Sequence, residues 1–321
     1  MTHKNPFPRR LMAALGLVIA VILAGGVWFY RTQHQQARQN IEGNLQTIAQ
    51  LKVEEIVAWR AERLGDAAAL MDSAFFIEGV KRWLAAPQAE DAENILTQFR
   101  SLQKNGHYRD VLLLDVGGKE RLSTSGRLSP IGEVEMQTLA LALSERRPVL
   151  TDLHTHPGDP MADLEIFAPL FAKDGAAAKP LAVAILRLDA GQFLYPMIQS
   201  WPAPSRTAET LLVRRDGESV LFLNEVRHRK ETALKLRIPL TRVEVPAVMA
   251  VLGKRGVMEG TDYRGVKSLA FLSAIPDSPW FMVTKMDDEE AFAVWRVESY
   301  FILALMLLAV TGALTTAGIL W

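Results

Sequence analysis

Residues 209–224 read ETLLVRRDGESVLFLN, and this stretch is the starting point for the fold. Its two ends, 210–215 and 219–223, are rich in apolar and β-branched residues, and Asp216-Gly217 lies between them. An Asp-Gly pair between two such runs is a strong short-range signal for a β-hairpin. The stretch therefore predicts two antiparallel strands joined by a tight turn.

The same pattern occurs earlier in the chain, at VLLLDVGGKERLSTS (111–125), where Gly117-Gly118 provides the turn. A second pair of strand-like runs follows each hairpin, at 164–171 with 181–188 and at 266–275 with 280–286. A short helix at 190–199 and the stiff linker WPAPS (201–205) separate the two sets. We therefore expect two α+β modules with antiparallel sheets, at 76–200 and 201–290.

A long helix is expected before the first module. No proline occurs between Pro8 and Pro87, and apolar residues from 41 to 75 recur mostly at intervals of three, four, seven or eight. A helix over 31–75 would be roughly 65 Å long and would form a stalk and then the spine of the modules. An exposed apolar stripe of this length needs a partner, which predicts a homodimer. A second helix is expected at 89–103, ending near Asn105-Gly106.

The two ends of the chain are predicted to cross a membrane. Residues 11–30 and 300–321 contain no charge, and about 20 such residues span the ~30 Å hydrocarbon layer. Aromatic residues at 28–30 and 300–301 suit the interfaces, and Lys4, Arg9 and Arg10 favour a cytoplasmic segment 1–10. Residues 31–299 would then be periplasmic, with the anchors in the inner membrane. A cleaved signal peptide is the alternative interpretation of the first span.

Composition excludes several classes of function. The 36 basic residues balance 36 acidic ones, which argues against a nucleic-acid partner. The chain has no cysteine, so disulfide scaffolds, thiol nucleophiles and cysteine-ligated metal sites are excluded. Phosphate-binding glycine loops, a serine nucleophile elbow and a His-Glu-x-x-His helix are also absent from the sequence. No cofactor is expected.

Three stretches carry a family resemblance. WPAPS (201–205) leading into ETLLVRRDG (209–217), then VLFLN (220–224), then GTDYRG (260–265) with SPWFMVTKMD (278–287) resemble the extracytoplasmic double Cache region of bacterial PAS-containing sensor histidine kinases and diguanylate cyclases. The resemblance covers about 35–290. It implies two PAS-like modules, the first membrane-distal, which sense a small molecule and dimerise. It also implies a cytoplasmic output domain or partner protein beyond the second span, and no enzymatic activity in residues 1–321.

The segment DLHTHPGD (152–159) is the strongest candidate for chemistry. Two histidines two residues apart, flanked by carboxylates, could supply nitrogen and oxygen ligands to zinc. The string is similar to the His-x-His-Pro of zinc isopeptidases, but the serine and aspartate spacing of that motif is missing. The favoured interpretation is a surface turn, and a separate possibility is that His154 lines a ligand site. A membrane-anchored metallohydrolase using His154 and His156 is the alternative function.

Other candidate ligand residues are Tyr108 and Asp189. The resemblance implies that an aspartate near Asp189 reaches the ligand, where it would pair with a cationic group; a helix N-cap is the slightly favoured interpretation of Asp189. Tyr108 is either a pocket aromatic or part of the core. The Tyr-x-Arg-x-Trp-Tyr run of amino-acid-binding relatives is absent, so no amino-acid ligand is inferred.

In the second module, the loop Asp262-Tyr263-Arg264 either binds a second ligand or is pinned by Lys285 and Asp287. Pinning is the favoured interpretation, and Glu289-Glu290 is interpreted as solvated surface. The overall prediction is a two-span sensor that binds a small molecule and passes a conformational signal through the second span. A structural partner without a ligand is the third possibility.

Overall fold

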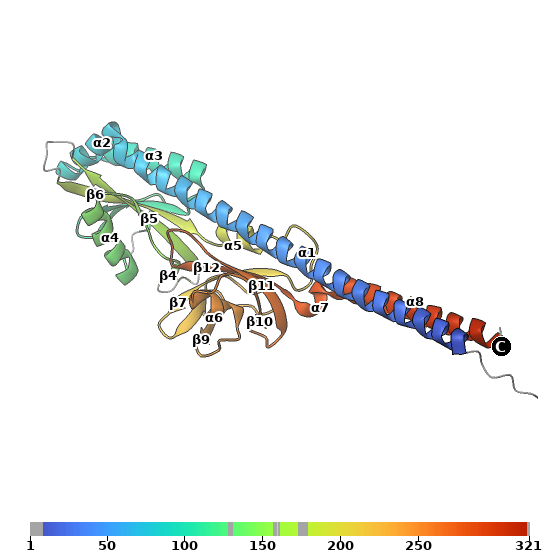
Figure 1. Cartoon of the computed structure of the whole chain (residues 1–321). Coiled ribbons are helices and arrows are strands. Elements are labelled where there is room, and N and C mark those ends of the chain that lie inside the picture. Colours follow the sequence, from blue (N-terminus) through green and yellow to red (C-terminus); the bar gives the residue numbers. More distant parts are fainter. Residues whose placement is uncertain (1–8, 128–130, 157–158, 160, 173–178, 320–321) are drawn as a thin grey trace, which may run out of the picture.

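A computed structural model describes residues 9–127, 131–156, 159, 161–172 and 179–319. Helix α1 (Arg9–Asp72) runs unbroken for 64 residues from the free end of the molecule to its far tip (Figure 1). It ends at Asp72, three residues earlier than predicted, because Ser73 starts a new helix, α2 (Ala74–Ala85). The Ser73 hydroxyl accepts the N–H of Phe76 at 3.3 Å, which is an N-cap contact.

The first module lies at the far tip of α1 (Figure 1). Its six-stranded antiparallel sheet has the order β2-β1-β6-β5-β3, and β4 pairs with β5. The strands are β1 (Asp110–Asp115), β2 (Glu120–Ser123), β3 (Val149–Leu150), β4 (His154–Thr155), β5 (Ala162–Phe171) and β6 (Pro180–Asp189). The helices are α2, α3 (Ala89–Gly106), α4 (Glu133–Glu145) and α5 (Leu194–Gln199).

The second module repeats this architecture nearer the free ends of α1 and α8 (Figure 1). Its sheet is also antiparallel, in the order β10-β11-β12-β7-β8-β9. The strands are β7 (Glu209–Asp216), β8 (Ser219–Phe222), β9 (Arg237–Pro239), β10 (Gly256–Thr261), β11 (Lys267–Ala274) and β12 (Trp280–Asp287). Helix α6 (Pro246–Val251) packs against β7, β8, β11 and β12.

The two sheets have matching registers at their centres. In the first, Arg187 on β6 lies between Asp110 on β1 and Glu165 on β5. In the second, Lys285 on β12 lies between Glu209 on β7 and Ala270 on β11. Arg187 and Lys285 therefore occupy equivalent positions, and the predicted repetition of one α+β layout is confirmed.

Both modules pack on α1. The apolar stripe of α1 is covered by the sheets of its own chain, with Leu45 1% and Ile56 0% exposed. The argument that this stripe needs a second copy is therefore wrong, because the stripe already has a partner. A single apolar cluster runs from this face of the first sheet to Trp280 in the second module, while α4 covers the opposite face of the first sheet.

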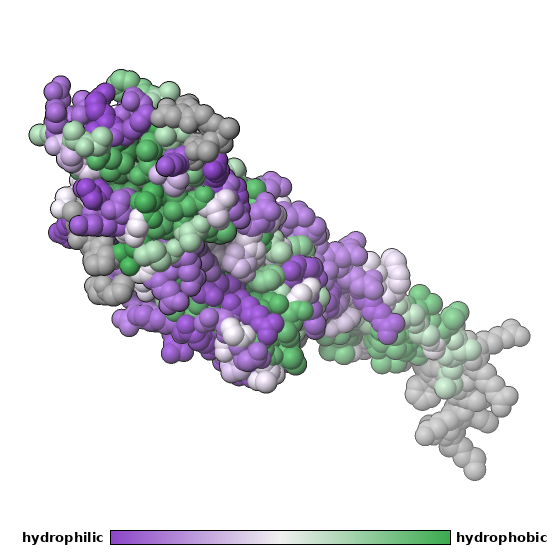
Figure 2. All heavy atoms as spheres, turned by 90° about the vertical axis from the view of Figure 1, so that its left-hand side faces the viewer, coloured by the Kyte–Doolittle hydropathy of each residue, from purple (hydrophilic) through white to green (hydrophobic). Residues whose placement is uncertain are grey.

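The chain leaves the second module through α7 (Asp288–Ala291) and α8 (Ala293–Ile319), which runs beside the first part of α1. The rings of Tyr30 and Trp295 are 5.1 Å apart, and Gly26 faces Met306, whose sulfur would lie 2.1 Å from an added Cβ. Both helices are long and apolar enough to cross a membrane. Figure 2 shows apolar surface at this end of the molecule, in contrast to the mainly hydrophilic second module.

Candidate functional site

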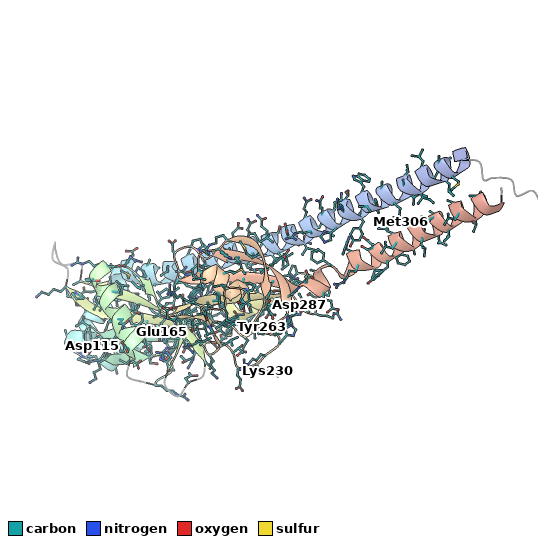
Figure 3. The ribbon with its side chains drawn as sticks, turned by 60° about the horizontal axis from the view of Figure 1, so that its bottom comes forward. Asp115, Glu165, Lys230, Tyr263, Asp287 and Met306 are labelled. Atoms are coloured by element: carbon teal, nitrogen blue, oxygen red, sulfur yellow. The ribbon has the colours of Figure 1, made fainter. Side chains whose placement is uncertain are left out.

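A cluster of four titratable side chains lies on the α4 face of the first sheet, beside the apolar contact of α4. Along β5, Leu164 and Ile166 face α1, so Glu165 and Phe167 face α4 by the alternation of a strand. Glu135 comes from the first turn of α4. His154 lies on β4 and His156 immediately after it. We call Glu135, His154, His156 and Glu165 the histidine cluster; Figure 3 labels Glu165.

The four side chains converge closely. Each offers one nitrogen or oxygen atom, and these atoms all lie within 4.8 Å of one another. Nδ1 of His156 is 2.9 Å from Oε1 of Glu135, and Nε2 of His154 is 3.8 Å from that same oxygen. The carboxylates are buried, with Glu135 3% and Glu165 0% exposed at the side chain. The imidazoles are mostly covered.

Each member of the cluster has a buried polar atom without a hydrogen bond: Oε1 of Glu135, Oε2 of Glu165 and Nε2 of both histidines. The other ring nitrogen of His154, Nδ1, lies 3.0 Å from the carbonyl oxygen of Asp152. A carbonyl oxygen can only accept, so Nδ1 carries the proton of a neutral ring. Nε2 of that ring then carries a lone pair and no proton. It lies 3.8 Å from Oε1 of Glu135 and 3.9 Å from Oε2 of Glu165.

Fixed charges surround the cluster. Arg187 donates from Nε to Oε1 of Glu165 at 2.5 Å. Arg109 donates to both oxygens of Asp163 at 3.0 Å and also pairs with Asp159. This connected set contains four carboxylates and two guanidinium groups, so carboxylates are in excess by two. The members of this set are Glu135, Asp159, Asp163, Glu165, Arg109 and Arg187.

The excess of carboxylates shifts the titration of the imidazoles. Glu135 and Glu165 raise the pKa of His156 to about 9, against the effect of burial. Burial lowers the pKa of His154, but Glu135, the Asp152 carbonyl and Glu165 together outweigh it, so this pKa is also raised. Burial opposes the charge of Glu135, yet the two histidines bring its pKa well below the usual range. The site as it stands therefore attracts positive charge.

The prediction of a surface turn at 152–159 is wrong for the histidines. The side chains of His154 and His156 are only 12% and 18% exposed, and His154 belongs to a strand. Residues 157, 158 and 160 lie outside the described residues. Sequence reasoning missed Glu135 and Glu165; the available signal was Glu165, a charged residue inside the otherwise apolar run LEIFAPLF (164–171).

The other two first-module candidates are placed differently. Asp189 lies opposite Asp163 in the sheet, at the margin of the histidine cluster, and its Oδ1 accepts the N–H of Gly191 at 2.7 Å. Tyr108 is 3% exposed in the core on the α1 side. Its hydroxyl donates to Asp66 at 2.6 Å, and burial together with Asp66 raises its pKa. The structure therefore does not bring Tyr108 and His154 together.

The loop Asp262-Tyr263-Arg264 in the second module takes part in a separate set of paired charges. We call Glu209, Asp262, Arg264, Lys285 and Asp287 the lysine cluster. Nζ of Lys285 lies 2.8 Å from Asp262 and 2.9 Å from Glu209. Arg264 pairs with Asp262 at 2.7 Å and also with Asp287. The ring of Tyr263 is 5.4 Å from Nζ of Lys285. The predicted pinning of this loop by Lys285 and Asp287 is confirmed, and Figure 3 labels Tyr263 and Asp287.

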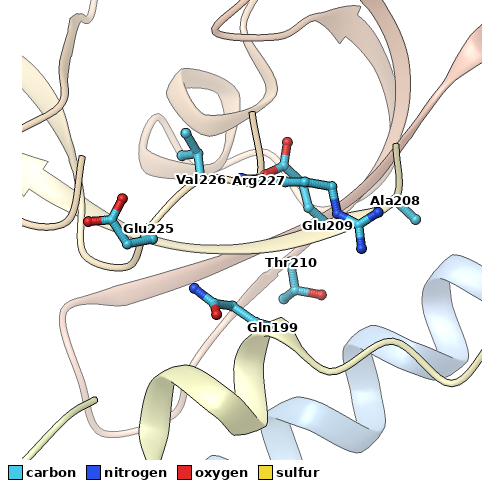
Figure 4. A pocket seen from close by; sticks show the side chains of 7 residues that line it. All are labelled: Gln199, Ala208, Glu209, Thr210, Glu225, Val226 and Arg227. Carbon is cyan, nitrogen blue, oxygen red and sulfur yellow. Dashed lines mark hydrogen bonds between the residues drawn. The ribbon is translucent and has the colours of Figure 1, made fainter. Parts of the chain in front are cut away.

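A cavity of about 360 Å³ lies between the end of α5 and the second module (Figure 4). It is lined by Gln199, Ala208, Glu209, Thr210, Glu225, Val226 and Arg227. Two lining carboxylates bind the chain itself: Glu209 accepts the N–H of Arg227 at 2.8 Å, and Glu225 accepts the N–H of Thr232 at 3.0 Å. The cavity is thus a polar gap whose carboxylates already have partners.

Asp152 joins the histidine cluster to the second module. Its carbonyl oxygen is the partner of His154, as described above. Its carboxylate accepts the indole N–H of Trp280 at 2.6 Å and lies 2.9 Å from Nε of Arg214. Trp280 begins β12, the strand that leads to α7 and α8. Asp152 therefore connects the segment just before β4 to the start of β12.

Solved structures with this fold are sensory domains. The ligand-binding domain of the Pseudomonas aeruginosa amino-acid chemoreceptor PctB with L-Gln matches with a TM-score of 0.53 at 18% identity, over 82% of this chain and 98% of that chain. The sensory domain of the Campylobacter jejuni chemoreceptor Tlp3 with isoleucine matches with a TM-score of 0.57 at 10% identity, over 80% and 96%. The extracellular domain of the putative histidine kinase vpHK1S-Z8 matches with a TM-score of 0.55 at 13% identity, over 79% and 98%.

At these low identities the structural similarity shows the fold alone. Residues of both modules together adopt the Cache-type fold of extracytoplasmic sensor domains, as the resemblance implied. No family model matches the sequence, and no curated protein matches it.

Proposed function

We propose that this chain is the sensory part of a transmembrane receptor, in which the first module receives a chemical signal outside the cytoplasm. The observation that carries the proposal is the course of the chain. Helix α1 runs from a membrane-length apolar segment to the far tip, and the last strand of the second module leads through α7, four residues long, into the second apolar helix. Both ends of the sensory region thus converge on one pair of helices.

In this proposal the histidine cluster receives the signal. Its members come from α4, β4 and β5, so anything that draws them together moves β4 relative to the sheet. Asp152 passes that movement to Trp280 and Arg214. The second module then shifts along α1, where Arg60 donates to the carbonyl oxygens of Pro276 and Asp277 in the turn before β12. Helix α8 carries the shift across the inner membrane to an output domain or partner protein.

The metallohydrolase interpretation is supported less well. Catalytic zinc keeps a coordination position for water or substrate and takes three protein ligands, whereas four side chains converge in the histidine cluster. Amino-acid binding, the property named for PctB and Tlp3, requires groups for an ammonium and a carboxylate. Here Asp163 and Glu165 are already bound by Arg109 and Arg187. Homodimerisation stays a prediction, to be measured by the mass of the purified chain.

The placement of the modules can be tested with single cysteines, because the natural chain has none. Lys230→Cys, on the exposed surface of the second module, should react with a membrane-impermeant maleimide in spheroplasts, and Thr2→Cys should react only after lysis. Labelling of Lys230→Cys only after lysis would overturn the proposed orientation.

Signal transmission can be tested on the full chain in lipid nanodiscs. Spin labels at Lys230→Cys and Glu298→Cys report the distance from the second module to α8. We expect one of the probes L-glutamine, L-arginine, L-isoleucine and Zn²⁺ to change that distance, and the change to disappear in Asp152→Asn. A change that survives Asp152→Asn would contradict transmission through this residue.

A further inference from the structure

We propose that the histidine cluster is a binding site for one divalent first-row transition metal ion of the zinc type, held by Glu135, His154, His156 and Glu165. The convergence of these four side chains, each with a buried polar atom that has no hydrogen bond, carries this proposal. Burial of a polar atom without a partner costs free energy, and folded proteins seldom retain it. The four side chains that carry these atoms each bring one nitrogen or oxygen within 4.8 Å of the others, two of them from buried carboxylates, and a cation can satisfy such an arrangement at once.

The spacing suits a small ion. In a regular tetrahedron with bonds of about 2.05 Å, as zinc forms with imidazole and carboxylate, the ligand atoms are about 3.3 Å apart. The distances from Nε2 of His154 to the two carboxylates are 3.8 and 3.9 Å, and that from Nδ1 of His156 to Glu135 is 2.9 Å. Because the four ligand atoms are separated by up to 4.8 Å, the side chains need to move by up to about 1.5 Å to close around the ion.

Outer contacts already orient two of the ligands. Protein metal sites hold a ligating histidine by its other ring nitrogen and a ligating carboxylate by its other oxygen. His154 is held in this way by the carbonyl oxygen of Asp152, and Glu165 by the guanidinium of Arg187. In both residues the atom left without a partner is the one that faces the cluster.

Charge and donor type restrict the ion. With neutral imidazoles, carboxylates exceed guanidinium groups by two among the six residues named above, so a divalent cation lowers the excess of negative charge. Two imidazole nitrogens favour zinc, copper, nickel or cobalt over calcium and magnesium, which prefer oxygen ligands and higher coordination numbers. Absence of cysteine disfavours the softer Cu(I).

Metal binding itself does not rest on the proposed function, whereas its role as the received signal does. Glu135, on α4, and the histidines, at β4, are brought together by the ion, and Asp152 links the latter segment to β12. A metal bound here would therefore act on the same connection that the proposed function uses.

The test uses the full chain in detergent, purified without a histidine tag and stripped with a chelator. Equilibrium dialysis against Zn²⁺ should give one ion per chain, with Mg²⁺ and Ca²⁺ unable to compete at a hundredfold excess. Glu135→Gln keeps the shape of the side chain, and His154→Gln keeps roughly its volume. Each variant should weaken zinc binding by at least about 100-fold, because loss of an outer-shell partner alone costs up to that much. His228→Ala, which removes an exposed histidine of the second module, should bind zinc as the natural chain does.

Each outcome decides the proposal. Zinc that is absent after dialysis, that binds equally to Glu135→Gln, or that is displaced by Ca²⁺ overturns it. Circular dichroism of the chelator-treated variants identifies unfolded protein. If His154→Gln unfolds, X-ray absorption of zinc bound to the natural chain decides, because two imidazoles in the first shell support the site and an all-oxygen shell overturns it. Zinc that binds as proposed but leaves the Lys230–Glu298 distance unchanged overturns only its role as the signal.

Discussion

The two modules place buried charges at the same end of equivalent sheets, and they neutralise those charges in different ways. In the second module, the lysine cluster sets Lys285 and Arg264 against Glu209, Asp262 and Asp287. In the first module, Arg187 takes the position of Lys285, but Glu165 replaces the equivalent Ala270, and Glu135 is added from α4. The positive partners of Glu135 among the described residues are the two imidazoles.

The lysine cluster and the histidine cluster therefore differ in whether the charge of their cationic side chains depends on the surroundings. The lysine cluster pairs its two cations with three carboxylates of the chain itself, so it is complete once the chain folds. An imidazole is neutral or charged according to what surrounds it, and its neutral form offers a lone pair. In the proposed function, the same position in the fold is therefore a fixed structural contact in the second module and a site that responds to its surroundings in the first.

The largest expected effect on stability comes from removing the lysine of the lysine cluster. Lys285→Met leaves Glu209 and Asp262 buried without their shared cation, and removal of one partner from a buried pair costs about 3–5 kcal/mol. Thermal unfolding of the full chain, followed by tryptophan fluorescence, measures the loss. Lys267→Met, on the exposed side of β11, is the matched control and should change stability by less than about 0.5 kcal/mol. A loss below about 1 kcal/mol in Lys285→Met would contradict the assigned role.

The next largest effect is the stabilisation that zinc should give through the histidine cluster. Zinc at about 100 times its dissociation constant should raise the free energy of unfolding by about 2.7 kcal/mol, because only the folded chain holds the four ligands together. In Glu135→Gln the increment should fall to near zero, whereas Lys267→Met should retain it in full. The measurement compares unfolding with zinc and with chelator in each protein. Equal increments in Glu135→Gln and the natural chain would show that the ion binds elsewhere.

A smaller effect is expected at the contact between the modules. Asp152→Asn removes the charge that Trp280 and Arg214 share, while keeping an oxygen that can accept from the indole. Hydrogen bonds to charged groups contribute about 1.5–3 kcal/mol, so a partial loss of about 1–2 kcal/mol is expected in thermal unfolding. Asp277→Asn, an exposed aspartate in the turn before β12, serves as the control. No difference between these two variants would refute the importance of Asp152.

The smallest effect concerns a carboxylate that neither a fixed cation nor an imidazole neutralises. Glu290, interpreted from sequence as solvated, instead accepts from the hydroxyls of Ser205 and Thr207 and from the N–H groups of Arg206 and Thr207. Burial opposes its charge, but these donors outweigh burial and lower its pKa from 4.5 to about 2. A lowered native pKa stabilises the fold fully above pH 4.5, and this stabilisation is lost as the pH falls towards 2.

Because Glu290 is partly exposed, solvent screening reduces the contribution to about 1 kcal/mol. The loss of stability between pH 6 and pH 3 should therefore be smaller in Glu290→Gln than in the natural chain. The two unfolding temperatures at each pH measure it. Identical pH dependence in the two proteins would mean that the linker contacts do not depend on the charge.

Much of the fold could be predicted because its signals are local. The hairpins at Gly117-Gly118 and Asp216-Gly217 and the later strand pairs are present within one or two residues of their expected bounds. Helix α4 was missed, and a physical reason is visible. Its apolar residues include the exposed Val134, Met136 and Leu141, so no single stripe marks it, and Gly132 provides no capping side chain.

The candidate site depends on what the chain brings together from a distance. The pair His154 and His156 is visible in the sequence, but Glu135 lies 19 residues before His154, on the helix that was missed. Glu165 lies 9 residues after His156, and only the pairing of β4 with β5 brings it close. Local sequence patterns could therefore identify the two histidines of the cluster. They could not identify the two glutamates or the packing that brings all four side chains together.

The continuity of α1 limits the kind of movement that can reach the membrane. A helix of 64 residues is about 96 Å long, and its backbone hydrogen bonds resist stretching. The distance from the free end of α1 to the first module is therefore nearly constant. What remains is a change in how the second module lies along this fixed length, and α7 gives β12 only four residues before α8 begins. In the proposed receptor, the movement that is passed on would then be a sliding or rotation of α8 against α1, whose length is constant.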